Sequence, residues 1–91
     1  MTDHAPEYII EVVLFNFYAT VKRESFSEEK TPPLTTQFTK IYKTAEERES
    51  QKKYIRRRSA KELGIPEEQL PPYKEENYKT LGDIVAEIKN F

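Results

Sequence analysis

The densest group of side chains able to do chemistry is the run 52–61, KKYIRRRSAK, which holds six bases and no acid. On a helix, Lys53, Arg57 and Lys61 are spaced at i, i+4 and i+8, so they lie on one face, and Tyr54 borders the same face. Positive charge at this spacing beside an aromatic ring could contact an anionic partner.

Three interpretations of this basic helix face are open. The bases can follow the phosphates of a nucleic acid, with the ring of Tyr54 as a stacking surface. They can receive the carboxylates of an acidic partner protein, which the arginine guanidinium pairs well. They can also form a solvated helix face, in which Glu49 pairs with Lys53 one turn away.

The side chains needed for catalysis are scarce. The chain has no Cys, two Gly and one His, His4. A cysteine nucleophile, a thiolate zinc site and a Gly-rich phosphate loop are therefore excluded. Its adjacent Glu pairs occur in polar segments, where a carboxyl group lacks the burial that would raise its pKa for acid catalysis. We predict a protein that is not an enzyme, with no cofactor, no metal and no small-molecule substrate.

Charge is distributed unevenly along the 91 residues, although the net charge is only -1. Residues 22–62 hold twelve bases against seven acids, whereas residues 1–21 and 63–91 each have three more acids than bases. The overall balance argues against a nucleic-acid coat protein or a polybasic membrane anchor. At this length we expect a single domain, 1–91, with residues 1–6 as a flexible tail.

No segment has the roughly 20 consecutive apolar residues that a membrane-spanning helix requires. The longest apolar stretch begins without a basic region and shows no small-residue cleavage site, which argues against a signal peptide. We therefore predict a cytoplasmic protein that does not contact a membrane.

The first two predicted elements are strands. Residues 8–22, YIIEVVLFNFYATVK, are rich in β-branched and aromatic residues and contain no Gly or Pro, which favours a strand. Residues 35–43 form a plausible second strand, with Phe38 and Tyr42 on one face. We expect the two strands to pair as an antiparallel hairpin, joined by a mobile connection at 23–34.

A capping box indicates the start of the first helix. Thr44 is followed three residues later by Glu47, so each can cap the other's backbone amide. The helix is predicted over 45–63 and should end at Gly64, which adopts the left-handed conformation without strain. Its buried stripe is thin and consists of Ala45, Ile55, Ser59, Ala60 and Leu63.

The second predicted helix covers 80–90. Thr80 can cap its first turn, with Asp83 three residues on. Apolar residues then repeat with helical spacing at Leu81, Ile84, Val85, Ile88 and Phe91. The predicted fold class is α+β, a small domain in which an antiparallel hairpin is followed by two helices packed on the sheet.

The first predicted strand has more apolar surface than the chain can cover. Its second face carries Ile10, Val12 and Leu14, yet only one other strand is evident. Cover can come from a third short strand in one of the connections, or from another chain by sheet continuation or dimerisation. Alternatively, the C-terminal helix covers one face, while Tyr73 and Tyr78 cover the other and tie down their connection.

These observations predict a non-catalytic protein-interaction module or small regulatory subunit. It would dock on a partner protein, or on itself as a homodimer, through Ile10, Val12 and Leu14 of the first strand and through the basic helix face. The alternative prediction is a small nucleic-acid-binding protein that uses the basic helix 52–61.

Overall fold

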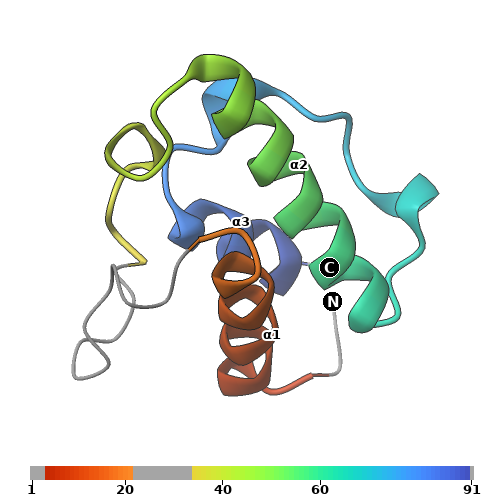
Figure 1. Cartoon of the computed structure of the whole chain (residues 1–91). Helices are drawn as coiled ribbons and strands as arrows, with labels where there is room; N and C mark the ends of the chain where they lie inside the picture. The colour runs from red at the N-terminus through yellow and green to blue at the C-terminus, as the bar shows by residue number, and fades with distance from the viewer. Residues whose placement is uncertain (1–3, 22–33, 91) are drawn as a thin grey trace.

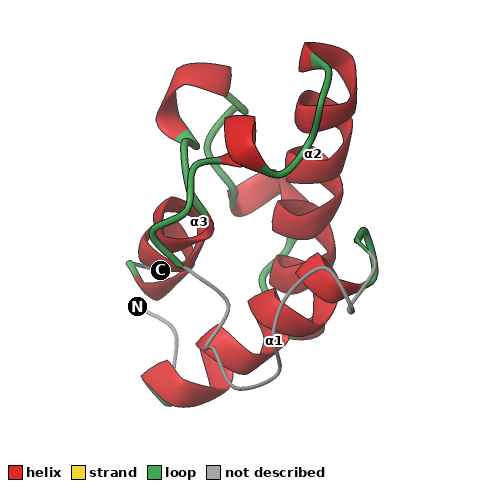
Figure 2. Cartoon of the chain, turned by 60° about the vertical axis from the view of Figure 1, so that its left-hand side comes forward, coloured by secondary structure: helices red, strands yellow, loops and turns green. Residues whose placement is uncertain are grey.

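The computed structural model of this chain describes residues 4–21 and 34–90, which are built from helices and loops (Figures 1 and 2). The three α-helices are α1 (Pro6–Tyr18), α2 (Ala45–Glu62) and α3 (Leu81–Lys89). Three short 3-10 helices lie between them, namely η2 (Phe38–Lys40), η3 (Glu67–Gln69) and η4 (Glu75–Asn77). Within the described ranges no strand is formed, and the predicted α+β hairpin fold is therefore wrong.

The predicted strand over 8–22 is instead largely the helix α1. Its buried residues repeat with a helical period, at Ile9, Val12, Val13, Asn16 and Phe17. Pro6 occupies the first turn, where its missing N–H costs nothing. The β-branched residues raise the strand propensity of this segment, but a weak propensity yields to tertiary packing, and α1 packs against both α2 and α3.

The predicted strand over 35–43 is also absent. Gln37 forms one isolated bridge with Thr80, and the backbone N–H of Phe38 donates to the carbonyl of Lys79 at 2.8 Å. The chain then turns through η2. Phe38 and Tyr42 do lie together, with ring centroids 6.0 Å apart, because residues four apart share a side in a strand and in a helical turn alike.

Both predicted helices are present with nearly the expected bounds. At the start of α2, the hydroxyl of Thr44 accepts a hydrogen bond from the Glu47 amide at 3.1 Å, and the helix gives way to Gly64 with a φ of +77°. At the start of α3, the side chains of Thr80 and Asp83 form a complete capping box. These ends were predictable because each depends on a few adjacent residues.

The core lies where the three α-helices meet. It is lined by apolar side chains from α1, α2, α3 and the segments that join them. Ser59 of α2 is buried, as predicted, and accepts a hydrogen bond from the Asn16 amide group at 3.2 Å. The same amide group donates to the carbonyl of Val12 at 3.0 Å. This polar contact fixes α1 against α2 at the centre of the molecule.

The predicted tail and connection are only partly described. Residues 1–3 and 22–33 lie outside the described residues. Of the remaining tail, His4 places its Nε2 atom 2.9 Å from the carbonyl oxygen of Leu63. In the described part of the chain, no helix is both long and apolar enough to cross a membrane.

We expect Ser59→Ala to lower the free energy of unfolding by about 1 kcal/mol, because the buried amide of Asn16 loses one acceptor. Ser50→Ala is the matched control on the exposed part of the same helix and should change stability by no more than about 0.5 kcal/mol. Urea denaturation followed by circular dichroism measures both. Equal stabilities of the two variants would contradict a structural role for the Ser59 hydroxyl.

Candidate functional site

The six bases of the run 52–61 divide into buried and exposed groups on α2. Lys52 is only 4% exposed and Arg56 only 7% exposed. The ammonium group of Lys52 donates to the backbone carbonyl of Tyr78 at 2.7 Å and lies 2.6 Å from a carboxylate oxygen of Glu75. It therefore holds the connection between α2 and α3 against the middle of α2.

Arg56 makes a second anchor of the same kind. Its Nε atom donates to the carboxylate of Glu87 on α3 at 2.5 Å, and its guanidinium also donates to the carbonyl of Pro71. The guanidinium lies 5.2 Å from the centre of the Tyr78 ring. Tyr78 completes the cluster by donating its hydroxyl proton to Glu87 at 2.5 Å.

The surroundings of these anchors shift the acidities of two neighbouring groups. Burial, together with the hydrogen bond to the Glu87 carboxylate, raises the pKa of Tyr78 to about 12. Burial alone would raise the pKa of Glu75, but hydrogen bonds from Lys52 and Tyr73 outweigh it and hold that pKa below its ordinary value. Both effects favour the hydrogen-bonded states seen in the fold near neutral pH.

Tyr73 and Tyr78 tie down the connection, as predicted. Tyr78 is buried, and the two rings stack with their centroids 5.1 Å apart. The hydroxyl of Tyr73 donates to Glu75. The connection between α2 and α3 is therefore held by aromatic packing as well as by the buried cations.

Two of the exposed bases are already paired along α2. Lys53 lies 2.9 Å from Glu49, the pair that the sequence predicted, and Arg58 lies 3.1 Å from Glu62. Both are i,i+4 pairs, which contribute little to stability at an exposed site. They do reduce the net positive charge that α2 presents to a ligand.

Arg57 and Lys61 are the remaining bases of the run. Both are exposed, and neither forms an ion pair with any described residue. They line a hollow of about 600 Å³ on the surface, which we call the basic groove. The groove is lined by Tyr54, Arg57, Arg58, Lys61, Gly64, Ile65, Pro66 and Glu67.

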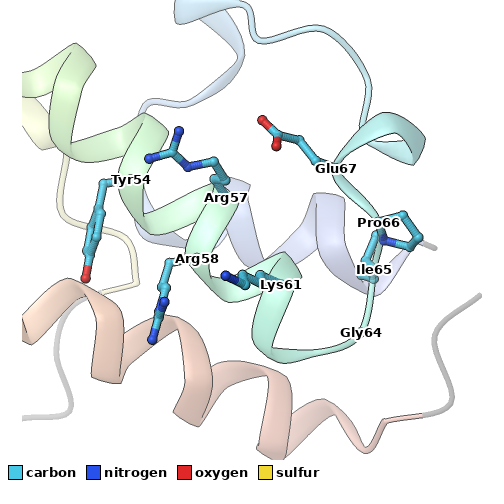
Figure 3. Close-up of a pocket in the computed structure, with 8 residues that line it drawn as sticks. All are labelled: Tyr54, Arg57, Arg58, Lys61, Gly64, Ile65, Pro66 and Glu67. Atoms are coloured by element: carbon cyan, nitrogen blue, oxygen red, sulfur yellow. The ribbon is translucent and has the colours of Figure 1, made fainter.

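One side of the basic groove is formed by basic side chains of α2, and the other side contains both apolar and acidic residues (Figure 3). Arg57 and Lys61 extend from α2, and the segment that follows α2 contributes Ile65, Pro66 and Glu67. The carboxylate of Glu67 points toward Arg57 across the hollow, although no ion pair joins these two described residues. The groove can therefore receive a negatively charged group next to an apolar one.

The predicted basic face is thus divided in the structure. Tyr54, Arg57 and Lys61 line one groove, together with Arg58, which the sequence analysis did not single out. Lys53 lies beside Tyr73 in a neighbouring hollow, with its ammonium 5.2 Å from the ring centre, and Arg57 and Glu67 line both hollows.

The predicted docking strand is not formed, because its residues belong to the helix α1. Val12 belongs to the core, and Ile10 and Leu14 are half-buried on the side of α1. A helix turns about 100° per residue, so positions that alternate along a strand point in different directions. Val12 therefore points away from Ile10 and Leu14, which lie one turn apart on the same side of α1.

The exposed aromatic surface of α1 was missed. Phe15 is 69% exposed and, with Glu11, Leu14, Tyr18 and Ala19, lines a shallow apolar hollow. A helical projection of residues 6–18 would have found this face, because it lies opposite the buried residues. Assigning a strand period concealed it.

Comparisons of the chain with protein-family models, curated proteins and solved structures found no match. Among the residues that the structure describes, no group of three or more His, Cys, Asp or Glu side chains is placed to hold a metal ion.

We expect Arg56→Leu to lower the free energy of unfolding by about 3 kcal/mol, because the carboxylate of Glu87 loses its buried partner. The connection over residues 65–79 should also become sensitive to chymotrypsin. Arg57→Leu makes the same chemical change one residue away at an exposed site and should alter stability by no more than about 0.5 kcal/mol. Similar losses in the two variants would show that Arg56 is not an anchor.

Tyr78 should make stability depend on alkaline pH. Because its pKa is 10.0 in the unfolded chain and about 12 in the fold, its contribution is complete below pH 10 and is lost as the pH rises toward 12. Tyr78→Phe should be less stable than the parent protein near neutral pH, and this difference should shrink above pH 10. Tyr54→Phe is the control on an exposed ring, and urea denaturation across the pH range tests the expectation. A difference that stays constant would refute it.

Proposed function

We propose that this protein is a non-catalytic interaction module that docks on an acidic surface of a partner protein through the basic groove. The observation that supports the proposal is the pair Arg57 and Lys61, two exposed cations without a described counter-ion, at one preformed hollow. Ile65 and Pro66 add apolar wall next to these charges. A partner that combines carboxylates with an apolar side chain matches both features.

A binding role suits the groove better than a catalytic one. Its lining contains no Ser, Cys or His that could act as nucleophile or general base. Guanidinium and ammonium groups instead favour charge-assisted hydrogen bonds to carboxylates. We place this activity in the cytoplasm, in accord with the sequence prediction.

The alternative function, nucleic-acid binding by the basic helix, has less support. Four of the six bases in the run 52–61 already pair with carboxylates of the same chain, namely Lys52, Lys53, Arg56 and Arg58. Two bases of the run remain, which is fewer than the roughly 6–10 phosphate contacts of a DNA-binding protein with strongly salt-dependent affinity. The exposed ring of Tyr54 beside Arg57 is the one feature that would suit a nucleic acid, as a stacking surface.

An affinity capture from the native host tests the proposal. The bait is the full chain, compared with the double variant Arg57→Glu/Lys61→Glu, and the lysate is used with and without nuclease. We expect a captured protein that survives nuclease treatment and falls by at least about tenfold with the double variant, because charge reversal at the groove repels an acidic surface.

The matched control is Lys74→Glu/Lys79→Glu, which makes the same charge change at two exposed lysines outside the groove. It should capture the partner as well as the parent chain does. Equal loss with both double variants would attribute capture to net charge and refute a role for the groove. Capture that disappears with nuclease would favour the nucleic-acid alternative.

A further inference from the structure

The outward side of α1 carries a stripe of two acids and an aromatic ring. Glu7, Glu11 and Phe15 are all exposed and are spaced at i, i+4 and i+8, so they follow one side of the helix. Residues 4–21 contain no Lys or Arg, which leaves this stripe negative. We call these three residues the acidic stripe. Phe15 at its end is 69% exposed and belongs to the apolar hollow on α1, and a contiguous exposed apolar patch is a common mark of a protein-interaction surface.

The basic groove carries the complementary pattern at the same spacing. Arg57 and Lys61 are four residues apart on α2, as Glu7 and Glu11 are on α1, and four residues rise about 6 Å along a helix. When the two helices are laid antiparallel, Glu7 lies opposite Lys61 and Glu11 opposite Arg57. The same register brings Phe15 opposite Lys53, one residue or about 1.5 Å along the axis from Tyr54, so its ring can also pack against the ring of Tyr54.

We propose that the basic groove is occupied by a second copy of this chain, whose acidic stripe lies along α2. The inference rests on the proposed function, that the groove is a protein-docking site, and names its partner. In a two-fold dimer each subunit offers its stripe to the groove of the other, so the contact is made twice.

The position of α1 beside α2 allows such a reciprocal contact. His4, just before α1, lies 2.9 Å from the carbonyl of Leu63 at the end of α2, and its ring lies 5.3 Å from the ring of Tyr8. The first turn of α1 is therefore level with the last turn of α2. Figure 3 shows Tyr54 and Arg58, two of the residues that line the basic groove, extending from α2 on the side of α1.

One dimer accounts for two features that the isolated chain leaves without a role. It gives carboxylate partners to Arg57 and Lys61, which have no ion pair with any residue in the described ranges, and it removes the ring of Phe15 from water. The surface area of one acidic stripe is small compared with that of a stable protein interface, but the two-fold repeat doubles the contact area. We expect a dimer that weakens as salt rises, since exposed ion pairs are screened.

A charge-swap experiment tests this arrangement with the full chain. One variant is Glu7→Lys/Glu11→Lys and the other is Arg57→Glu/Lys61→Glu. Each variant alone places like charges opposite each other and should dimerise at least about a hundredfold more weakly than the parent chain. In an equal mixture both contacts are again attractive, so a heterodimer should form. Sedimentation equilibrium measures all of these masses over a range of concentration and salt.

Two further variants test the specificity of the contact. Phe15→Ala changes no charge and should weaken dimerisation at least about tenfold by removing the buried ring. Lys74→Glu/Lys79→Glu should dimerise as the parent chain does. Circular dichroism establishes that each variant is folded. If Glu7→Lys/Glu11→Lys does not fold, Glu11→Lys paired with Arg57→Glu gives the same swap test.

Several outcomes would overturn the inference. A parent chain that stays monomeric up to near-millimolar concentration would do so. Undiminished dimerisation of Arg57→Glu/Lys61→Glu would show that the groove is not the interface. Folded swap variants that remain monomeric when mixed would also exclude this pairing. If the parent chain is a monomer but still captures an acidic partner through the groove, the dimer inference is wrong and the proposed function stands. If mixing the swap variants restores a heterodimer and no other protein is captured, the dimer inference is supported.

Discussion

The buried cluster of Arg56, Glu87 and Tyr78 is the interaction on which the rest of the structure depends. α2 is a polar helix with a thin apolar stripe, so apolar burial alone gives it little hold on the core. Arg56 compensates by contacting α3 through Glu87 and the long connection through the carbonyl of Pro71. A buried ion pair of this kind contributes less to net stability than its Coulomb energy suggests, but losing one partner leaves an unpaired charge. Its main effect is to determine where the connection can lie.

The position of the proposed binding surface follows from that restraint. Residues 64–67 form one wall of the basic groove, and the connection to which they belong is held against α2 by Arg56 and Lys52. The bases of the run 52–61 therefore fall into two groups with different roles. Buried members position the wall, and the exposed members Arg57 and Lys61, which form no ion pair with a described residue, are the ones we propose to contact a partner. A count of positive charges in the run overstates what is left for binding, because four of the six are neutralised within the chain.

The success and failure of the sequence predictions have a common physical origin. The helices over 45–63 and 80–90 were predictable because caps and Gly64 act over three or four residues, and the structure keeps those local contacts. Residues 8–22 lack such signals, so their β-branched content decided the prediction, and it was wrong. The helical period of their apolar residues favours a helix only when α2 and α3 are present to bury one side of that helix. The exposed Phe15 was overlooked for the same reason, since a wrong period assigns side chains to wrong faces.

By itself the sequence determined the helix ends, the uneven distribution of charge, the basic run and the lack of most catalytic side chains. Those properties depend on composition and on neighbours a few residues apart. Tertiary structure alone decided that residues 6–18 are helical, that Lys52 and Arg56 are buried while Arg57 is exposed, and that the groove exists. Arg56 and Arg57 are the same residue type and differ only in the direction in which their side chains leave the helix. What each one meets is set by residues such as Glu87, 31 positions away, and such distant contacts are formed only when the whole chain packs.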